Sequence, residues 1–282
     1  MKFINSNSLI TRATLFLLFA IGVLSFSSAG QRKAELSTVD QLQIDLKAVP
    51  CKSTDRLKAA HDLFTKLGAL PENMTIENPG GIKNLIVRKP GKTNDIIVVG
   101  AHYDKVELGC GAIDNWTGIV TIAHLFKAIK DVNTDKTILF IAFGGEESGL
   151  LGSKAMTRTI GKEQLKQYCA MVNIDSLGMT GLETPSNMSN RKMMAAASDL
   201  AKSLGIKISQ SEMEGADADS SSFVIKKIPA ISIIGISPDW PRVLHTPNDQ
   251  IARVDARLVS LGYQFAFSLV EKIDNSSCDA FR

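Results

Sequence analysis

The sequence lacks several features that would point to other classes of protein. Its four cysteines form no CxxC pair, and it has no internal repeat and no low-complexity tract. A zinc site built from cysteines is therefore not expected. The formal net charge is only +3, and removal of residues 1–30 would leave +1. A charge so close to neutral predicts no basic surface that binds nucleic acid.

Long apolar runs are also missing after the first thirty residues. Within those first thirty residues, Lys2 and Arg12 precede an uncharged apolar segment, residues 13–24, and small residues follow that segment. This layout is typical of a signal peptide, and the segment is short for a membrane span, although an uncleaved anchor remains the alternative. We predict a signal peptide over residues 1–30 and a single domain over residues 31–282. The protein would be exported, periplasmic or secreted, without stable membrane insertion after cleavage.

The cysteines of an exported protein are candidates for disulfides. Four cysteines allow three complete pairings, and the sequence does not choose among them. Cys51 and Cys278 lie near the two ends of the mature chain, so a link between them is our preferred expectation, with Cys110 and Cys169 as the other two cysteines. Buried free thiols are the alternative.

Apolar runs and segments of helical periodicity alternate along the chain. The expected helices cover residues 36–69 with a break at Pro50, 117–130, 149–159, 193–204 and 258–273. The expected strands are two within residues 78–104, joined by a turn at Pro90-Gly91, and then 137–143, 169–174 and 230–236. This alternation predicts an α/β three-layer sandwich with a mostly parallel central sheet and helices on both faces.

Acids and imidazoles follow several of the predicted strands. In chain order they are His102, Asp104, Asp114, Glu146, Glu147, Asp175 and His245. In an open α/β sheet, ligands bind outside the carboxyl ends of the strands, so these side chains are expected at one edge. Taken singly, each acid could instead cap a helix, complement its dipole or form a turn. His61 and His124 lie within helical patterns and are predicted to be structural.

Imidazoles and carboxylates together form a ligand set that suits zinc. The carboxylates are too many for one tetrahedral ion, but two ions about 3.5–4 Å apart that share a bridging carboxylate would use them all. Glu146 and Glu147 are adjacent and diverge, so one can bind metal while the other acts as a general base on the reacting water. Asp104 shares a strand face with His102 and is predicted to hold its second ring nitrogen.

With these residues placed, the chain resembles the co-catalytic zinc aminopeptidase family typified by secreted bacterial leucyl aminopeptidases. The resemblance covers residues 83–269 and rests on five motifs in the family's order. They are GAHYD at 100–104, GAIDNWTG at 111–118, FGGEESGLLGS at 143–153, NIDSLG at 173–178 and HTPND at 245–249.

The resemblance implies a role for each of these residues. Asp114 would bridge two zinc ions, with Glu147 and His245 completing one site and His102 with Asp175 the other. Glu146 would be the general base, Asp104 would orient His102, and a cis peptide would link Asp114 and Asn115. The implied activity is removal of the N-terminal residue from peptides or proteins by a hydroxide that bridges the two zinc ions, within a single zinc-peptidase domain.

The chain departs from the family pattern at three places. Leu244 replaces a tyrosine that precedes the last histidine in many relatives, Ser220 replaces a histidine after Asp219, and Lys227 replaces a glycine. Asp219 is therefore left out of the ligand set. The alternative functions are a glutaminyl cyclase-like acyltransferase with one zinc, a non-catalytic peptide-binding relative, and a carboxypeptidase or dipeptidase. No oligomeric state is predicted.

Overall fold

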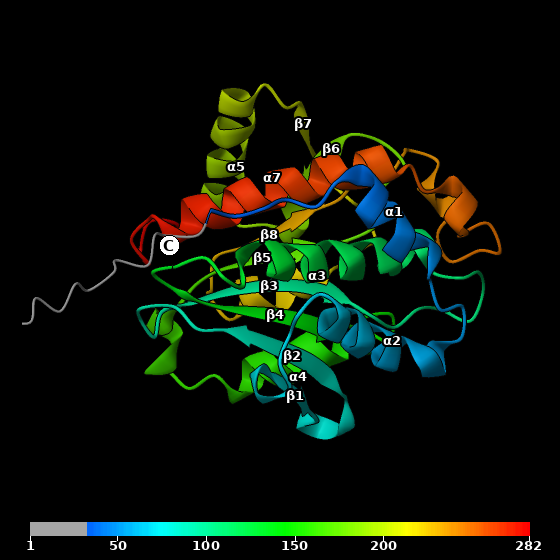
Figure 1. Ribbon diagram of the computed structural model, residues 1–282. Coiled ribbons are helices and arrows are strands. Elements are labelled where there is room, and N and C mark those ends of the chain that lie inside the picture. Colours follow the sequence, from blue (N-terminus) through cyan, green and yellow to red (C-terminus); the bar gives the residue numbers. More distant parts are fainter. Residues whose placement is uncertain (1–32) are drawn as a thin grey trace, which may run out of the picture. The chain divides into compact units, whose positions relative to one another are not determined.

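A six-stranded sheet runs through the computed structural model, which describes residues 33–282 (Figure 1). Its strands are β1 Met74–Glu77, β2 Asn84–Lys89, β3 Ile96–His102, β4 Thr137–Phe143, β5 Tyr168–Ile174 and β8 Ala230–Ile233, in the order β1-β2-β4-β3-β5-β8. β4, β3, β5 and β8 run parallel, whereas β2 is antiparallel to both of its neighbours. The mostly parallel sheet is confirmed. The strands that flank Pro90-Gly91 do not pair, because β4 lies between them.

Helices cover both faces of this sheet, as predicted (Figure 1). One face carries α1 Val39–Lys47, α2 Ser53–Lys66, α3 Thr117–Ile129 and α7 Ala256–Asp274, and the other carries α4 Leu151–Thr159 and α6 Asp219–Ile225. A small second sheet pairs β6 Leu182–Pro185 with β7 Ile208–Ser211 in parallel, beside α5 Arg191–Leu204. The three-layer α/β sandwich therefore has a minor sheet that the sequence pattern did not predict.

Side chains of the central strands alternate between two hydrophobic cores. In β3, Ile97 and Val99 pack beneath α1, α2, α3 and α7, whereas Val98 packs with α4 and α6. This alternation follows from the two-residue period of a strand. Because both faces are covered, β3 and β4 are apolar almost throughout, and all seven residues of β4 are buried. Burial on both faces fixes the strand ends rigidly, and these ends carry the predicted site.

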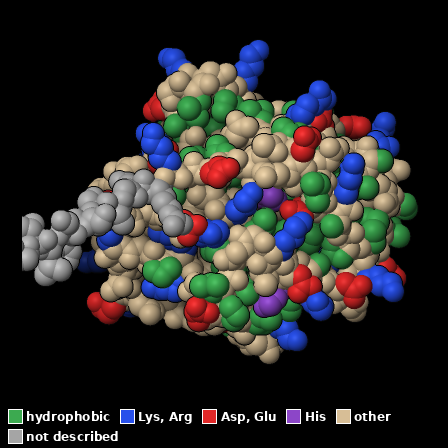
Figure 2. Space-filling model, in the orientation of Figure 1, with side chains coloured by type: hydrophobic (Ala, Val, Ile, Leu, Met, Phe, Trp, Pro, Cys, Tyr) green, Lys and Arg blue, Asp and Glu red, His purple; other side chains and the backbone are tan. Residues whose placement is uncertain are grey.

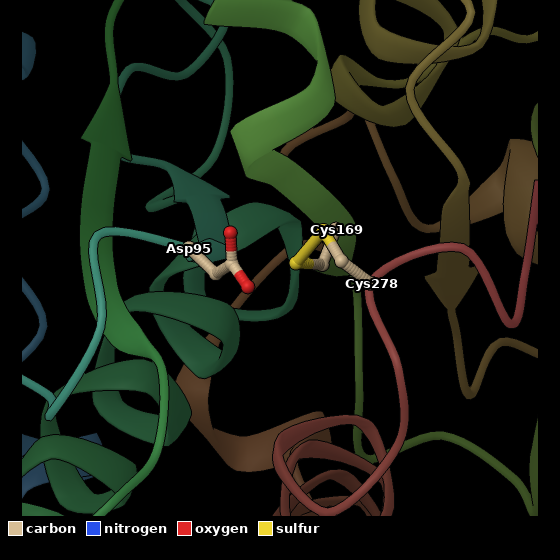
Figure 3. A group of neighbouring side chains, drawn as sticks. All are labelled: Asp95, Cys169 and Cys278. Atoms are coloured by element: carbon tan, nitrogen blue, oxygen red, sulfur yellow. A yellow bond between two sulfur atoms is a disulfide. The ribbon is translucent and has the colours of Figure 1, made fainter.

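Two disulfides connect the four cysteines, as Cys51–Cys110 and Cys169–Cys278. The expected link between Cys51 and Cys278 is therefore wrong. Cys51 precedes α2, which packs beside the loop that contains Cys110, whereas the segment after α7 returns to the start of β5 at Cys169. Asp95 lies near the second disulfide (Figure 3). Because the sulfurs of Cys169 and Cys278 are bonded to each other, neither is a thiolate that could bind metal together with Asp95.

The described residues form one compact unit. The predicted signal peptide, residues 1–30, lies outside them and stays a prediction. Within the described residues, no helix combines the length and the apolarity needed to cross a bilayer. On the face shown in Figure 2, Lys and Arg side chains are interspersed with Asp and Glu, so neither sign of charge dominates it.

Candidate metal centre

The parallel strands bring the predicted residues to one edge of the sheet. His102 is the last residue of β3, and Asp175 directly follows β5. After β4 the chain turns at Gly144-Gly145, where Gly145 has a φ of +69° that favours glycine. The turn places Glu146 and Glu147 beside the ends of the neighbouring strands. All seven side chains singled out in the sequence lie in this region.

Two ligand sets meet at Asp114. On one side, Nε2 of His102 lies 3.0 Å from Asp114 Oδ1 and 3.6 Å from Asp175 Oδ1. On the other, Nε2 of His245 lies 3.1 Å from Asp114 Oδ2 and 3.0 Å from Glu147 Oε2. Within each set, the ligand atoms all lie within 4.8 Å of one another. The two carboxylate oxygens of Asp114 thus face different sets, the arrangement that a bridging carboxylate requires.

The backbone around Asp114 is tied to the end of β5. The peptide between Asp114 and Asn115 is cis, as the resemblance implied. The Asn115 amide donates to the carbonyl of Ile174 at 2.9 Å, and its oxygen accepts the N–H groups of Gly118 and Ser176. A Cβ on Gly118 would lie 2.3 Å from that oxygen, so a larger residue would separate the two segments. These contacts set the spacing between Asp114 and the strand end that carries Asp175.

Asp249, which was not singled out as a site residue, fixes Asp114 from the other side. Its carboxylate accepts the backbone N–H groups of Ile113 at 2.7 Å and Asp114 at 3.2 Å, and the side chain is buried. The signal was present, since Asp249 ends the HTPND motif whose histidine was chosen. An acid four residues from a ligand gives no indication by itself that it binds backbone.

Asp104 contacts both glutamates rather than the imidazole alone. Its carboxylate accepts the backbone N–H groups of Glu146 at 3.1 Å and Glu147 at 3.2 Å. Its carbonyl oxygen lies 3.2 Å from Nδ1 of His102, whereas its carboxylate lies 3.7 Å away. Asp104 therefore connects the end of β3 to the glutamate turn, and the contact to the ring nitrogen comes from the main chain.

Electrostatic coupling shifts the pKa values on the Asp114 side of the centre. Burial alone would raise the pKa of Asp114, but hydrogen bonds with His102 and His245 hold it well below its ordinary value. Hydrogen bonds to Asp114 and Glu147 raise the pKa of His245 to about 10. Burial would lower the pKa of His102, but Glu146 and other carboxylates around it raise it well above its usual range. In the metal-free protein, the protonated imidazoles of His102 and His245 supply positive charge among the carboxylates.

Burial outweighs the contacts with positive groups for two other acids of the centre, so their net pKa shift is upward. It raises the pKa of Glu146 to about 10 and that of Asp219, behind it, to about 7. Asp219 is fully buried, and neither of its carboxylate oxygens lies in hydrogen-bond geometry with any described residue, although the nearby Ser153 side chain favours its charged form. Both acids would ionise more readily with additional positive charge nearby.

The donors fit zinc ions. Each set offers one imidazole nitrogen and carboxylate oxygens, which are ligands that zinc takes readily. Moreover, Glu147 Oε1 is buried and has no hydrogen-bond partner among the described residues. A buried carboxylate oxygen without a partner is costly, and a metal ion would satisfy it. The residues present therefore match two metal sites that share Asp114.

A cavity of about 370 Å³ opens directly onto this centre. One side is formed by the metal-site residues, and the other is largely apolar. The apolar side includes Met188, Met213, Ile234, Ile236, Trp240 and Leu244. Leu244, noted in the sequence as a departure from the family pattern, therefore adds apolar surface and no hydroxyl. A larger cavity of about 700 Å³ beside α5 and β7 contains none of the strand-end acids.

The histidines predicted to be structural lie outside the cluster. His124 is buried on α3 between Ser37 Oγ, at 2.7 Å from Nδ1, and Asp45 Oδ2, at 3.1 Å from Nε2. His61 is partly exposed on α2, near Asp62. Like Asp249, Arg56 is a buried polar side chain near the centre that was not predicted from the sequence.

This fold and this strand-end site define the class of zinc exopeptidase-like α/β proteins. The sequence narrows the class further, since residues 84–265 match the model of the family described as "Peptidase family M28". The chain belongs to that family.

Several known proteins are similar to this chain. Aminopeptidase YwaD of Bacillus subtilis is 32% identical over 192 residues, which cover 64% of this chain and 41% of that protein. The solved structure of a zinc aminopeptidase from Bacillus subtilis aligns with a TM-score of 0.62 at 25% identity, covering 71% of this chain and 54% of the other. The chain thus spans only about half the length of such relatives.

A third similarity concerns the fold alone. An Acidobacteriales bacterium glutaminyl cyclase aligns with a TM-score of 0.73 at 17% identity, over 86% of this chain and 97% of that chain. The same scaffold therefore occurs in proteins named for two different reactions, and the choice between them depends on the site.

Proposed function

We propose that this protein is a zinc-dependent aminopeptidase that removes the N-terminal residue from peptides or proteins, with two zinc ions per chain. The observation that carries the proposal is the pair of ligand sets that share Asp114, with Glu147 and His245 on one side and His102 and Asp175 on the other. Bound zinc ions would supply a water of pKa about 7, a Lewis acid for the scissile carbonyl and a ligand position for the free amine.

Glu146 is the proposed general base. Its Oε2 lies 4.0 Å from Nε2 of His102, at the edge of the first ligand set and on the wall of the cavity. Its carboxylate would take a proton from the attacking water and return it to the departing amine. Because burial raises the pKa of Glu146 to about 10, the group needs the positive charge of the metal site to serve as a base near neutral pH.

The cavity suggests which peptides would be bound. Its apolar side, with Met213, Ile236 and Leu244 among its members, would receive an aliphatic side chain of the first residue. Apolar side chains are stabilised there by removal from water. The walls near the metal site remain acidic, which favours a free amino group over a blocked one. A peptide would enter with its N-terminus toward the carboxylates.

We also propose that the protein is exported. Two disulfides form among the described residues, and disulfides persist mainly in oxidising compartments. The apolar stretch near the start of the sequence supports the same location. Residues 1–30 would then be a signal peptide, and residues 31–282 a single catalytic domain.

The test uses Leu-p-nitroanilide, its N-acetylated form, and zinc analysis before and after chelation. The proposal expects about two zincs per chain, cleavage of the free amine only, and loss of activity on chelation that returns with zinc. Equal cleavage of both substrates would show that the protein does not recognise the free amino group.

The same protein can be given a peptide that begins with glutamine, to test the cyclase alternative. One zinc per chain with cyclisation and no hydrolysis would favour the one-zinc acyltransferase. Binding of peptides without turnover would favour the non-catalytic relative. A C-terminally blocked peptide tests the carboxypeptidase and dipeptidase alternatives. Enzymes that need a free C-terminus do not cleave it, whereas an aminopeptidase does.

A further inference from the structure

Arg56 is a fully buried arginine on α2, in contact with the loops that carry metal-site residues. Its exposed fraction is 0%, and among the described residues its guanidinium donates to main-chain carbonyls alone. Nε donates to Tyr103, Nη1 to Pro50 at 3.2 Å and to Cys110 at 3.0 Å, and Nη2 to Gly111 at 3.1 Å. A planar guanidinium suits such a set, because its donors point in several fixed directions.

Three of the four carbonyls that Arg56 binds belong to the segments that carry the ligands. Tyr103 lies between His102 and Asp104, and Gly111 is three residues before Asp114. One side chain therefore holds the end of β3 and the loop of the bridging acid at a fixed separation.

The Cys51–Cys110 disulfide reinforces this junction. It joins the segment before α2 to the same loop, next to the two carbonyls at Pro50 and Cys110 that Nη1 contacts. The guanidinium carbon of Arg56 also lies 5.6 Å from the centre of the Trp116 ring, within the range of a cation–π contact. α2 and the segment before it are thus linked to the metal loops at several points.

The charge of Arg56 also bears on the centre. Burial lowers its pKa to about 10, so the group is still positive at neutral pH, and Asp114, Asp249, Asp104 and Glu147 favour that charge. No described carboxylate forms a direct ion pair with it. The positive charge therefore acts on the acidic cluster as a whole, and Arg56 is not among the residues that line the cavity.

We propose that Arg56 is a positioning residue of the metal centre, which sets the separation between the His102 and Asp114 segments through the four carbonyls. The inference rests on the proposed zinc sites. It goes beyond them because Arg56 lies outside residues 84–265, the part of the chain that matches the family. The N-terminal helices would then be part of the metal-binding machinery and not only a cover for the sheet.

The test compares Arg56→Met and Arg56→Lys with the wild type, using zinc affinity from competition with a chromophoric chelator. Loss of an outer-shell contact costs about 10–100-fold in metal affinity, and we expect this for both variants. Lysine keeps the charge but has a single head group, which cannot reach carbonyls on three segments. Amide hydrogen exchange should also accelerate over residues 103–114.

Two control variants separate positioning from general effects. Arg88→Met removes an exposed arginine from β2 and should leave zinc affinity and exchange unchanged. Ile273→Ala removes a fully buried side chain of α7, at a cost of about 2–5 kcal/mol, and should lower the melting temperature without weakening zinc binding. A merely structural role for Arg56 would give the same pattern as Ile273→Ala.

Three outcomes would overturn the inference. Wild-type zinc affinity in both Arg56 variants would exclude a positioning role. Retained affinity in Arg56→Lys alone would assign the effect to charge and not to the carbonyl contacts. Complete loss of the fold in both variants would make Arg56 a general core residue. If the wild type itself binds no zinc, it is the proposed function that fails, so the two failures are distinguishable.

Discussion

Replacing Asp249 by asparagine should weaken the metal centre without touching any proposed ligand. The two oxygens of Asp249 each accept one backbone N–H, from Ile113 and Asp114. An asparagine has one amide oxygen and one NH₂ group, and the latter cannot accept. One buried N–H next to the bridging acid would be left unpaired, and the Asp114 loop would relax toward another arrangement.

The size of the effect follows from that single unpaired group. An unsatisfied buried donor costs about 1–3 kcal/mol. For a domain of this size, each kcal/mol lowers the melting temperature by about 2–4 °C. Displacement of Asp114 should further weaken zinc binding by about 10–100-fold, the usual cost of losing an outer-shell contact. The charge removed is itself buried, which raises the pKa of Asp249 and reduces the net loss of stability.

The assay is calorimetric melting with and without zinc, together with chelator competition. Asp199→Asn is the matched control, because it removes the same charge from an exposed position on α5. Asp249→Asn should melt at a lower temperature and gain less from zinc than the wild type does, while Asp199→Asn should match the wild type. Wild-type zinc affinity in Asp249→Asn would show that this carboxylate does not hold Asp114 in place.

Four further predictions concern the metal centre and the two disulfides. Glu146→Gln should keep both zincs while kcat falls by about 10²–10⁴-fold, whereas Glu147→Gln should lose metal, and activity within a few fold of wild type in Glu146→Gln would contradict the base assignment. The pKa of His245 is raised to about 10, so zinc must displace a proton from its imidazole. Zinc affinity should therefore rise from pH 6 to pH 9. Calorimetry of zinc binding in two buffers at pH 7 should detect the released protons. In the metal-free protein the stability that comes from this raised pKa is complete below about pH 6.5 and is lost as pH rises through 10, so its melting temperature should fall over that window. Removal of the Cys169–Cys278 disulfide should lower the free energy of unfolding by about 2–5 kcal/mol and leave zinc affinity unchanged. Removal of Cys51–Cys110 should lower both the free energy of unfolding and the zinc affinity. Equal zinc affinity in the two variants would contradict the link between Cys51–Cys110 and the metal loop.

Much of the fold could be predicted because its central elements are long and strongly patterned. The strand at Thr137–Phe143 has the predicted bounds. α3 begins at the predicted residue and ends one residue earlier, whereas α7 begins two residues earlier and ends one residue later than predicted. β1, β6 and β7 were missed because each has only four residues and mixes polar with apolar side chains, whereas the equally short β8 was found by its buried apolar run. Short strands depend on their neighbours rather than on their own sequence.

The site was predictable to the extent that its residues carry chemistry at strand ends. The acids and imidazoles were found because parallel strands end at one edge, a rule that needs no coordinates. Asp249 and Arg56 were not found, because both act through backbone groups whose partners are distant in sequence. Arg56 did leave a signal, since it occupies the same helical face as the buried Ala60 and Leu63. The disulfide pairing required the path of the chain in space.

A crystal structure of the zinc-loaded protein, with anomalous data at the zinc edge, tests directly whether two ions share Asp114. We expect two peaks, one on each side of Asp114, the first among His102, Asp114 and Asp175 and the second among His245, Asp114 and Glu147. A single peak, or zinc bound away from Asp114, would contradict this expectation.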